Sequence, residues 1–196
     1  MGAGPLLVVL TGPSGAGKDT LLAELNSHSG RYHIAVNATT RPPRAGERNG
    51  VDYHFVSRDE FQRMLRDSDL LEHALVYGQD KGVPKRPIRE ALAAGKDVLL
   101  RTDIQGARTI KSLVPGAVTI FVAPPSVEEL KRRVRSRGAD TPEQIELRER
   151  IATEEMAAAG EFDHTVVNDD LTRCAEEIEA IMSRERLRRD RMPVVI

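Results

Sequence analysis

The stretch LLVVLTGPSGAGKDT at residues 6–20 decides the fold. Its first half is a short apolar run, which is typical of a strand buried on both faces of a parallel sheet. Its second half is rich in glycine and ends on Lys18 and Asp19, where we expect a helix to begin. Glycines let a loop wrap tightly, so that backbone N–H groups point at one phosphate, while the helix N-terminus and a lysine add positive charge. The stretch therefore predicts a strand, a phosphate-binding loop and a helix.

Similar short apolar runs recur along the chain and alternate with amphipathic segments. Helix starts are indicated by the capping boxes SVEE at 126–129 and TPEQ at 141–144, and a helix beginning near Pro87 is expected to end at Gly95. This alternation predicts an α/β fold in which helices cover both faces of a parallel sheet. Strands are expected at 6–10, 97–100, 118–122 and 165–167.

Two stretches depart from this alternation. Residues 36–83 are polar and turn-rich, with alternation at 51–56, a helix cap at Ser57 and a strand at 70–77. Residues 132–148 are polar and rich in arginine, which favours a mobile flap. We therefore expect one domain, with a core of residues 1–35, 84–131 and 149–196, an inserted lobe of 36–83 and a lid of 132–148.

Composition excludes several classes of function. The 196 residues include 29 basic and 30 acidic side chains, so no basic field favours nucleic acid or an anionic membrane. Tryptophan is absent, which argues against a base-stacking platform. The lone Cys174 cannot form an internal disulfide, and the histidines follow no metal-ligand spacing. We expect a cytoplasmic globular protein, either a monomer or a homodimer.

Beyond the loop, the chain resembles the guanylate kinases over nearly its whole length. The resemblance rests on GPSGAGKDT at 12–20, ATTRPPRAGERNGVDYHFVS at 38–57, ALAAGKDVLLRTDIQGA at 91–107, APPSVEELKRR at 123–133 and VVND at 166–169. It implies the P-loop nucleoside-monophosphate kinase fold with an inserted monophosphate lobe and an arginine lid. It also implies ATP-dependent phosphorylation of GMP, and of dGMP, with Mg²⁺ arriving on ATP.

The ATP side combines the loop with residues that the resemblance implies. Asp19 stands where Ser or Thr usually touches magnesium, so a carboxylate there could hold a magnesium-bound water or favour the helix N-terminus. Asn168 and Asp169 match the segment beside the donor adenine, although capping of the last helix explains them equally well. The complete set is Gly12, Pro13, Ser14, Gly15, Ala16, Gly17, Lys18, Asp19, Thr20, Arg135, Asn168 and Asp169.

Transfer between two phosphates needs fixed cations more than a base. The attacking phosphate oxygen is already anionic at neutral pH, so the difficulty lies in bringing two polyanions into line. Lys18 would serve the donor phosphates, and the resemblance implies that the lid arginines Arg135, Arg137 and Arg148 stabilise the transferring group; Lys18, Arg137 and Arg148 are the predicted catalytic residues. A surface ion pair is the structural alternative for each lid arginine.

The resemblance also implies the GMP side. Arg41, Arg44 and Tyr53 match the phosphate-binding positions, and guanidinium forks suit phosphate oxygens. Glu72 matches a carboxylate that accepts guanine N1–H and N2–H, although an exposed strand charge is an alternative. For Asp103, which matches a second acid near the base, a helix N-cap is nearly as good an explanation. The complete set is Asn37, Arg41, Arg44, Tyr53, Glu72, Lys81 and Asp103.

Several positions depart from the family pattern. The family commonly has Ser at Asn37, Ser or Thr at Val83, Tyr at Lys81 and an acidic residue at Arg101. Val83 cannot donate a hydrogen bond to guanine O6, so we expect discrimination between bases to be weaker.

Two other activities are compatible with parts of the pattern. A ribose 1,5-bisphosphate kinase resembles guanylate kinases but recognises no base, so it has no need of Glu72. A non-catalytic guanylate-kinase-like module binds phosphorylated peptides, but such modules lose the loop lysine and lid arginines that are present here.

Overall fold

The computed structural model describes residues 4–29, 31–76, 78–135 and 142–196. Within these ranges the core contains a five-stranded sheet in the order β2–β7–β1–β8–β9, with every neighbouring pair parallel. The expected strands are confirmed to within a residue or two at their ends. The strands are β1 (Leu7–Thr11), β2 (Tyr32–Ile34), β7 (Asp97–Arg101), β8 (Val118–Ala123) and β9 (His164–Val167).

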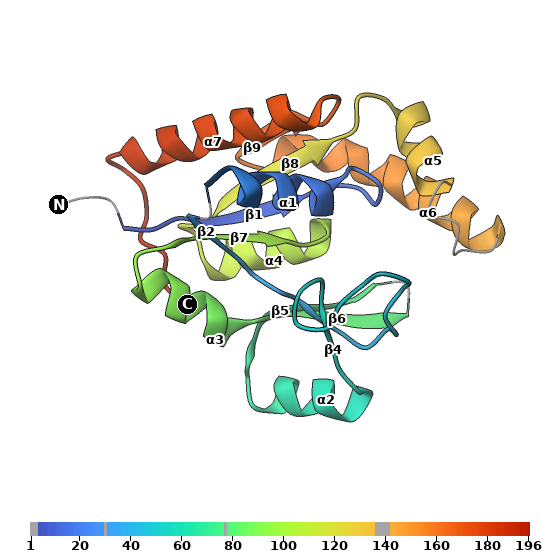
Figure 1. The fold of residues 1–196 in the computed structure, drawn as a ribbon, viewed down its shortest axis with the longest axis horizontal. Helices are drawn as coiled ribbons and strands as arrows, with labels where there is room; N and C mark the ends of the chain where they lie inside the picture. The colour runs from blue at the N-terminus through green and yellow to red at the C-terminus, as the bar shows by residue number, and fades with distance from the viewer. Residues whose placement is uncertain (1–3, 30, 77, 136–141) are drawn as a thin grey trace.

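Helices cover both faces of this sheet (Figure 1). Alternation along β1 explains the layers: Val8 and Leu10 pack with side chains of α1 (Lys18–Ser29) and α7 (Leu171–Leu187). Leu7 and Val9 pack on the opposite face with α3 (Lys85–Ala93) and α4 (Ile104–Leu113). All five side chains of β1 are fully buried. The predicted α/β fold with a parallel, doubly covered sheet is therefore confirmed.

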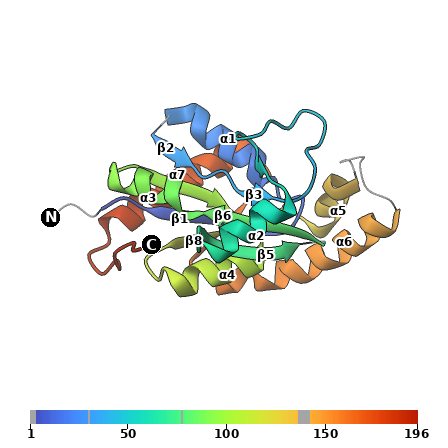
Figure 2. The same cartoon turned by 90° about the horizontal axis from the view of Figure 1, so that it is seen from below.

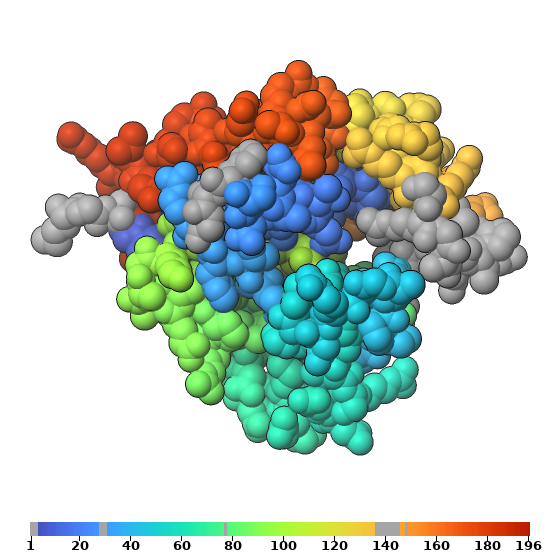
Figure 3. Space-filling view, viewed as in Figure 1, coloured from blue at the N-terminus to red at the C-terminus, as the bar shows by residue number. Residues whose placement is uncertain are grey.

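A second sheet lies beside the core, in the order β4–β3–β6–β5. Its members are β3 (Ala38–Thr39), β4 (His54–Phe55), β5 (Leu70–Val76) and β6 (Gln79–Pro84). Helix α2 (Arg58–Arg66) lies below them in Figure 1 and in front of them in Figure 2. Phe61 of α2 is buried with Ala38 and Leu70, so this part of the chain has its own small apolar cluster. The space-filling view shows it as a protrusion beneath the core (Figure 3).

The second sheet differs in detail from the sequence prediction. Alternation at 51–56 yields only the two-residue β4, which pairs in parallel with β3. The polar segment Gln79–Pro84 was not expected to be a strand, yet it pairs antiparallel with β5. The reason is strand pairing: β5 lies immediately before this segment and offers one hydrogen-bonding edge, and the distant β3 pairs with its other side. Tyr77, the last residue of the predicted strand at 70–77, lies outside the described residues.

The helix caps were predicted well where they can be compared. The backbone N–H of Glu60 donates to the side chain of Ser57, and the backbone N–H of Glu129 donates to the side chain of Ser126, each at 3.1 Å. The cap at Thr141 lies outside the described residues. Helix α3 begins two residues before Pro87.

The arginine-rich stretch 132–148 is helical where it is described. It is divided between α5 (Val127–Arg135) and α6 (Pro142–Met156), and a 3-10 turn η1 (Ala157–Glu161) follows. No helix within the described ranges combines the length and apolar character needed to cross a membrane.

Candidate active site

The predicted phosphate loop connects β1 to α1 at the carboxyl end of the sheet. Strand β1 is central; the chain leaves β1 for β2 on one side of it and leaves β7 for β8 on the other side, and α/β folds bind ligands where the strand order reverses in this way. Gly12, Gly15 and Gly17 have φ values of +133°, +97° and +89°, a region that side-chain-bearing residues rarely adopt. A Cβ at Gly12 would also lie 2.3 Å from the carbonyl oxygen of Val122. The loop geometry therefore requires these glycines.

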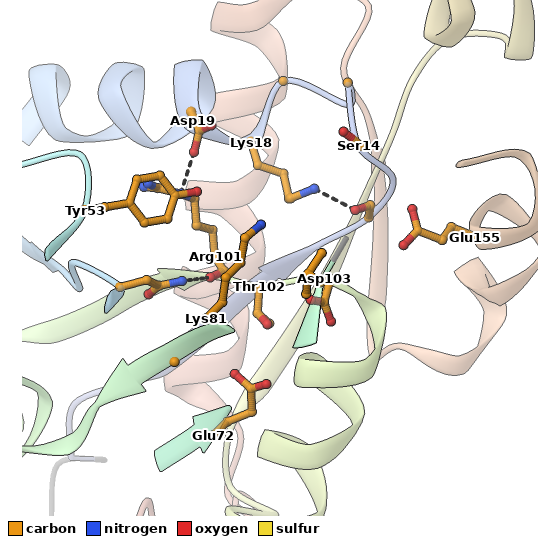
Figure 4. Close-up of a pocket in the computed structure, with 16 residues that line it drawn as sticks. Ser14, Lys18, Asp19, Tyr53, Glu72, Lys81, Arg101, Thr102, Asp103 and Glu155 are labelled. Carbon is orange, nitrogen blue, oxygen red and sulfur yellow. Dashed lines mark hydrogen bonds and ion pairs between the residues drawn. The ribbon is translucent and has the colours of Figure 1, made fainter. Parts of the chain in front are cut away.

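Lys18 places its ammonium group inside this loop. Its Nζ donates hydrogen bonds to the carbonyl oxygens of Gly12 at 2.6 Å and Pro13 at 3.0 Å (Figure 4). Because these two carbonyls hold the lysine, its positive charge is fixed at the start of α1. Ala16 N–H bonds back to Pro13 O at 3.1 Å, which closes the turn.

Asn168 supports the loop from the opposite end of the chain. Its side-chain Nδ2 donates to the carbonyl oxygen of Ala16 at 2.8 Å, and its backbone carbonyl oxygen accepts from Nη2 of Arg133 at 3.1 Å. A Cβ at Gly17 would come within 2.4 Å of that amide nitrogen. The neighbouring Asp169 instead forms an ion pair with Arg173 in the first turn of α7. The structure therefore separates the two predicted adenine-side residues.

One cleft brings most of the predicted residues together. The loop contributes Gly12, Ser14, Gly15, Gly17, Lys18 and Asp19 to its lining. The other wall is provided by the predicted residues Asn37, Tyr53, Glu72, Lys81 and Asp103. Figure 4 shows Lys81 extending toward Lys18 across the cleft. Pro13 and Ala16 are buried within the loop, and Thr20 is exposed on α1.

Glu72 is the most perturbed acid of the cleft. It belongs to β5 and is only 5% exposed, so the alternative of an exposed strand charge is wrong. Burial raises the pKa of Glu72 to about 7; Asp103 adds to the rise and Lys81 opposes it. A Cβ at Gly106 would lie 2.9 Å from the carboxyl group, so the first turn of α4 packs closely against Glu72.

Asp103 has a structural role that the sequence anticipated. It precedes α4, and its carboxylate accepts a hydrogen bond from the backbone N–H of Gly106 at 2.8 Å. The helix N-cap interpretation is therefore confirmed. The same carboxylate also faces the cleft, so a contact with the base stays a prediction.

Arg41 is held by neighbours from its own loop. Its guanidinium group makes two contacts with Glu47, and its Cζ lies 5.0 Å from the centre of the Tyr53 ring. The hydrogen bond to Glu47 is the main cause that raises the pKa of Arg41. Arg44 is exposed; its backbone N–H donates to the Glu47 carboxylate at 2.7 Å, and its carbonyl oxygen accepts from the Glu47 backbone N–H at 3.1 Å. Neither arginine is among the residues that line the cleft.

Arg101 and Asp19 form a contact that the sequence analysis did not anticipate. The Nε of Arg101 lies 2.5 Å from Oδ1 of Asp19, and its Nη2 donates to the carbonyl oxygen of Asp52 at 2.6 Å. Its Cζ lies 4.7 Å from the centre of the Tyr53 ring. Burial lowers the pKa of Arg101, but Asp19, Tyr53 and Asp52 raise it by more. The sequence contained a signal for this ion pair. Asp19 departs from the usual phosphate-loop pattern, Arg101 departs from the family pattern, and the two side chains carry opposite charges.

Glu155 is a second residue that sequence reasoning missed. It lies on α6 and lines the cleft, with its carboxylate directed at the phosphate loop (Figure 4). Its Oε2 is buried without a hydrogen-bond partner among the described residues. Burial raises the pKa of Glu155, while Lys18 opposes the rise. No sequence signal singled it out, because it lies in a helix with several acidic residues.

The lid arginines can be placed only in part. Arg135, at the end of α5, is 65% exposed and pairs with Glu149 of α6 at 2.6 Å. Arg137 lies outside the described residues, as does the side chain of Arg148. Their predicted contact with the transferring group stays a prediction.

Comparisons with known proteins agree with this geometry. A family model described as guanylate kinase matches residues 5–185. The chain is 48% identical to a guanylate kinase from Gloeobacter violaceus, over 91% of this chain and 87% of the relative. It is 42% identical to one from Carboxydothermus hydrogenoformans, over 95% and 92% of the two chains. The crystal structure of guanylate kinase from Anaplasma phagocytophilum matches with a TM-score of 0.79 and 32% identity, over 96% of this chain and 90% of that one. With the phosphate loop, the buried Glu72 and the matching fold in place, the chain belongs to the guanylate kinase family.

Proposed function

We propose that this guanylate kinase transfers the γ-phosphoryl group of ATP to the phosphate of GMP, and also of dGMP. The observation that supports this most directly is that one cleft contains both the phosphate loop with Lys18 and the buried carboxylate of Glu72. The loop supplies N–H groups and positive charge for a triphosphate. The carboxylate supplies the acceptor that a guanine base needs.

Glu72 provides the choice of base. The Watson–Crick edge of guanine presents N1–H and N2–H as donors, and an ionised carboxylate accepts from both. Adenine presents a lone pair at N1, which the carboxylate would repel. Glu72 is almost completely buried, so its carboxylate cannot be solvated by bulk water. A base that offers it no hydrogen bond therefore binds more weakly, because the cost of the buried, unpaired charge is not offset.

The acceptor phosphate would be bound by the lobe formed by residues 36–83. Arg41, Arg44 and Tyr53 are the residues we assign to it, together with Lys81, whose ammonium already faces the cleft. Arg41 and Arg44 would turn or move with the lobe to reach the phosphate. A fork of N–H groups suits two phosphate oxygens at once.

Transfer itself needs alignment and charge rather than a base. Lys18 would stabilise the donor phosphates, and the lid residues Arg135, Arg137 and Arg148 would neutralise charge on the transferring group. We assign residues 132–148 to this lid and the remaining segments, 1–35, 84–131 and 149–196, to the core. Closure of the lid would exclude water, which competes with GMP as an acceptor.

Magnesium would be bound mainly by ATP and water. No group of three or more His, Cys, Asp or Glu side chains within the described ranges is arranged to hold a metal. The Asp19 carboxylate is 62% exposed beside the loop, and its oxygen chemistry suits a magnesium-bound water. When bound, the ion would neutralise phosphate charge. We place the enzyme in the cytoplasm, since its single cysteine is buried and unpaired.

A substrate panel tests the proposal. We expect ATP-dependent turnover with GMP and dGMP and much slower turnover with AMP and UMP. Lys18→Ala should abolish turnover with every acceptor, whereas Glu72→Ala should mainly damage the choice of base. Turnover of AMP equal to that of GMP would contradict the proposal. Phosphorylation of ribose 1,5-bisphosphate, or tight phosphopeptide binding without ATP turnover, would support the two alternatives.

A further inference from the structure

Arg101 connects two parts of the molecule that bind different substrates in the proposed reaction. It ends β7 of the core sheet, and its side chain is only 11% exposed. On one side its Nε meets Asp19, the residue that follows Lys18 in α1. On the other side its Nη2 bonds to the carbonyl oxygen of Asp52, in the loop before β4. One guanidinium group therefore bridges the phosphate loop and the 36–83 lobe.

The same guanidinium group also contacts the ring of Tyr53, which lines the cleft on the side of the 36–83 lobe. Two guanidinium groups contact the ring of Tyr53, with the Cζ atoms of Arg41 and Arg101 at 5.0 and 4.7 Å from its centre. Such contacts are attractive because the face of the ring carries partial negative charge. Asn37 adds a further link, since its Nδ2 donates to the carbonyl oxygen of Arg101 at 2.8 Å. The lobe is thereby attached to the end of β7 by side-chain and backbone contacts.

Asp19 creates an electrostatic problem that Arg101 offsets. The carboxylate stands beside the loop that would receive a triphosphate, and like charges repel. With its Nε 2.5 Å from Oδ1 of Asp19, the guanidinium group of Arg101 offsets this negative charge. The repulsion between Asp19 and a bound triphosphate is thereby reduced.

We propose that Arg101 is a positioning residue with two separable tasks: it neutralises Asp19 beside the donor site, and it ties the Asp52–Tyr53 loop of the acceptor lobe to the core. This inference rests on the proposed phosphorylation of GMP. The first task acts on ATP binding and depends on Asp19. The second acts on GMP binding and does not depend on Asp19.

The two tasks can be separated with a double-mutant cycle of Arg101→Gln and Asp19→Asn. Dissociation constants for ATP and GMP would be measured by titration calorimetry on the whole protein, and KM and kcat in parallel. Arg101→Gln should weaken ATP binding about five- to tenfold, because Asp19 is then uncompensated, and GMP binding about tenfold. In titrations without magnesium, where Asp19 has no metal-bound water to hold, adding Asp19→Asn should restore ATP affinity to within about twofold of the wild type, because no carboxylate remains to be neutralised, while GMP affinity stays weak.

Recovery of ATP affinity by a second substitution is not expected of a merely structural residue. Arg101→Lys tests the same point with a gentler change, because it keeps a positive charge near Asp19 but loses the fork that also reaches Asp52. It should leave ATP affinity unchanged and weaken GMP affinity. Arg86→Gln is the matched control, since it breaks an exposed ion pair with Glu90 on α3 and should change neither constant.

Two results would overturn the inference while leaving the proposed function intact. One is a double variant that binds ATP no better than Arg101→Gln. The other is GMP affinity that stays at the wild-type value in both Arg101 variants. Failure of the wild-type protein to bind or phosphorylate GMP would instead reject the proposed function. Thermal denaturation of each variant shows whether a change in affinity follows from loss of folded protein.

Discussion

The side chains of Arg41 and Glu47 form a fork, with guanidinium nitrogens 2.5 and 2.6 Å from the two carboxylate oxygens. Both groups are largely shielded, at 7% and 20% exposure. Glu47 also accepts from the backbone N–H of Arg44, so the acidic residue organises the loop in which both predicted phosphate-binding arginines lie. Two N–H groups of Arg41 are thus aligned side by side, which is the geometry that a phosphate can accept.

Replacement of Arg41 by lysine tests the importance of this fork. Lysine keeps one positive charge but has neither the paired N–H groups nor the planar face that stacks on Tyr53. We expect KM for GMP to rise about tenfold, which corresponds to about 1.4 kcal/mol, while KM for ATP stays within about twofold. Arg63→Lys on the exposed surface of α2 is the control. An unchanged KM for GMP would show that Arg41 does not contact the acceptor.

The raised pKa of Glu72 predicts a pH dependence of GMP binding. In the empty cleft this carboxyl group keeps its proton up to about pH 7, mainly because it is buried. Guanine needs the ionised form, so KM for GMP should fall as the pH rises through about 7 and then level off. Steady-state kinetics between pH 5.5 and 8.5, at saturating ATP, measure this.

Glu72→Gln is the control for that profile. The second ionisation of the GMP phosphate, near about pH 6, affects both proteins alike, so only the wild type should show the additional change near pH 7. The same raised pKa gives the wild type a stabilising contribution that is complete below the ordinary value of 4.5 and lost as the pH rises through about 7. Identical pH profiles for the two proteins would argue against a role of Glu72 in base recognition.

Gly17→Ala should disable the donor site. The backbone φ of Gly17 is +89°, and a Cβ there would meet the Asn168 amide at 2.4 Å, so the loop would lose its hydrogen bond from Asn168. We expect KM for ATP to rise about tenfold or more. Gly95 has a similar φ of +74°, but a Cβ there would meet no atom within 4 Å. Gly95→Ala should therefore lower stability and leave KM for ATP unchanged. Equal behaviour of the two variants would contradict the role of Asn168 as a support.

Glu155→Gln should strengthen ATP binding at neutral and alkaline pH. The carboxylate points at the loop that would receive the triphosphate, and removing its charge removes a repulsion. Because burial raises the pKa of Glu155, the wild-type carboxylate takes up a proton more readily as the pH falls, so the advantage of the variant should shrink with falling pH. Glu154→Gln, on the exposed neighbour, is the control. Weaker ATP binding by Glu155→Gln would show that the acid supports the loop instead.

Much of the core was predictable because its strands are buried on both faces. Strands β1, β7 and β8 read as continuous apolar runs, and serine caps marked two of the helices. The strands β2, β3 and β6 were missed because β2 and β3 have only three and two residues, and β6 is polar, with glycine and proline. Their pairing depends on neighbours that a local pattern does not contain.

The site was predictable in its residue types more than in its contacts. The glycine pattern identified the phosphate loop, and the family resemblance pointed to Glu72, whose burial a hydropathy pattern alone would not suggest. The contact of Asp19 with Arg101 joins two distant segments, so it exists only once β7 lies beside β1. Glu155 likewise became a cleft residue only when α6 packed beside the loop.

Transfer of label from ATP to GMP measures the proposed phosphorylation itself. The protein would be incubated with ATP labelled at the γ-phosphate and with unlabelled GMP, and the products separated by chromatography. We predict that label appears in the β-phosphate of GDP, in amounts equal to the ADP formed, and that Lys18→Ala forms none. Label that enters only inorganic phosphate, or none in GDP while ATP is consumed, would contradict the account.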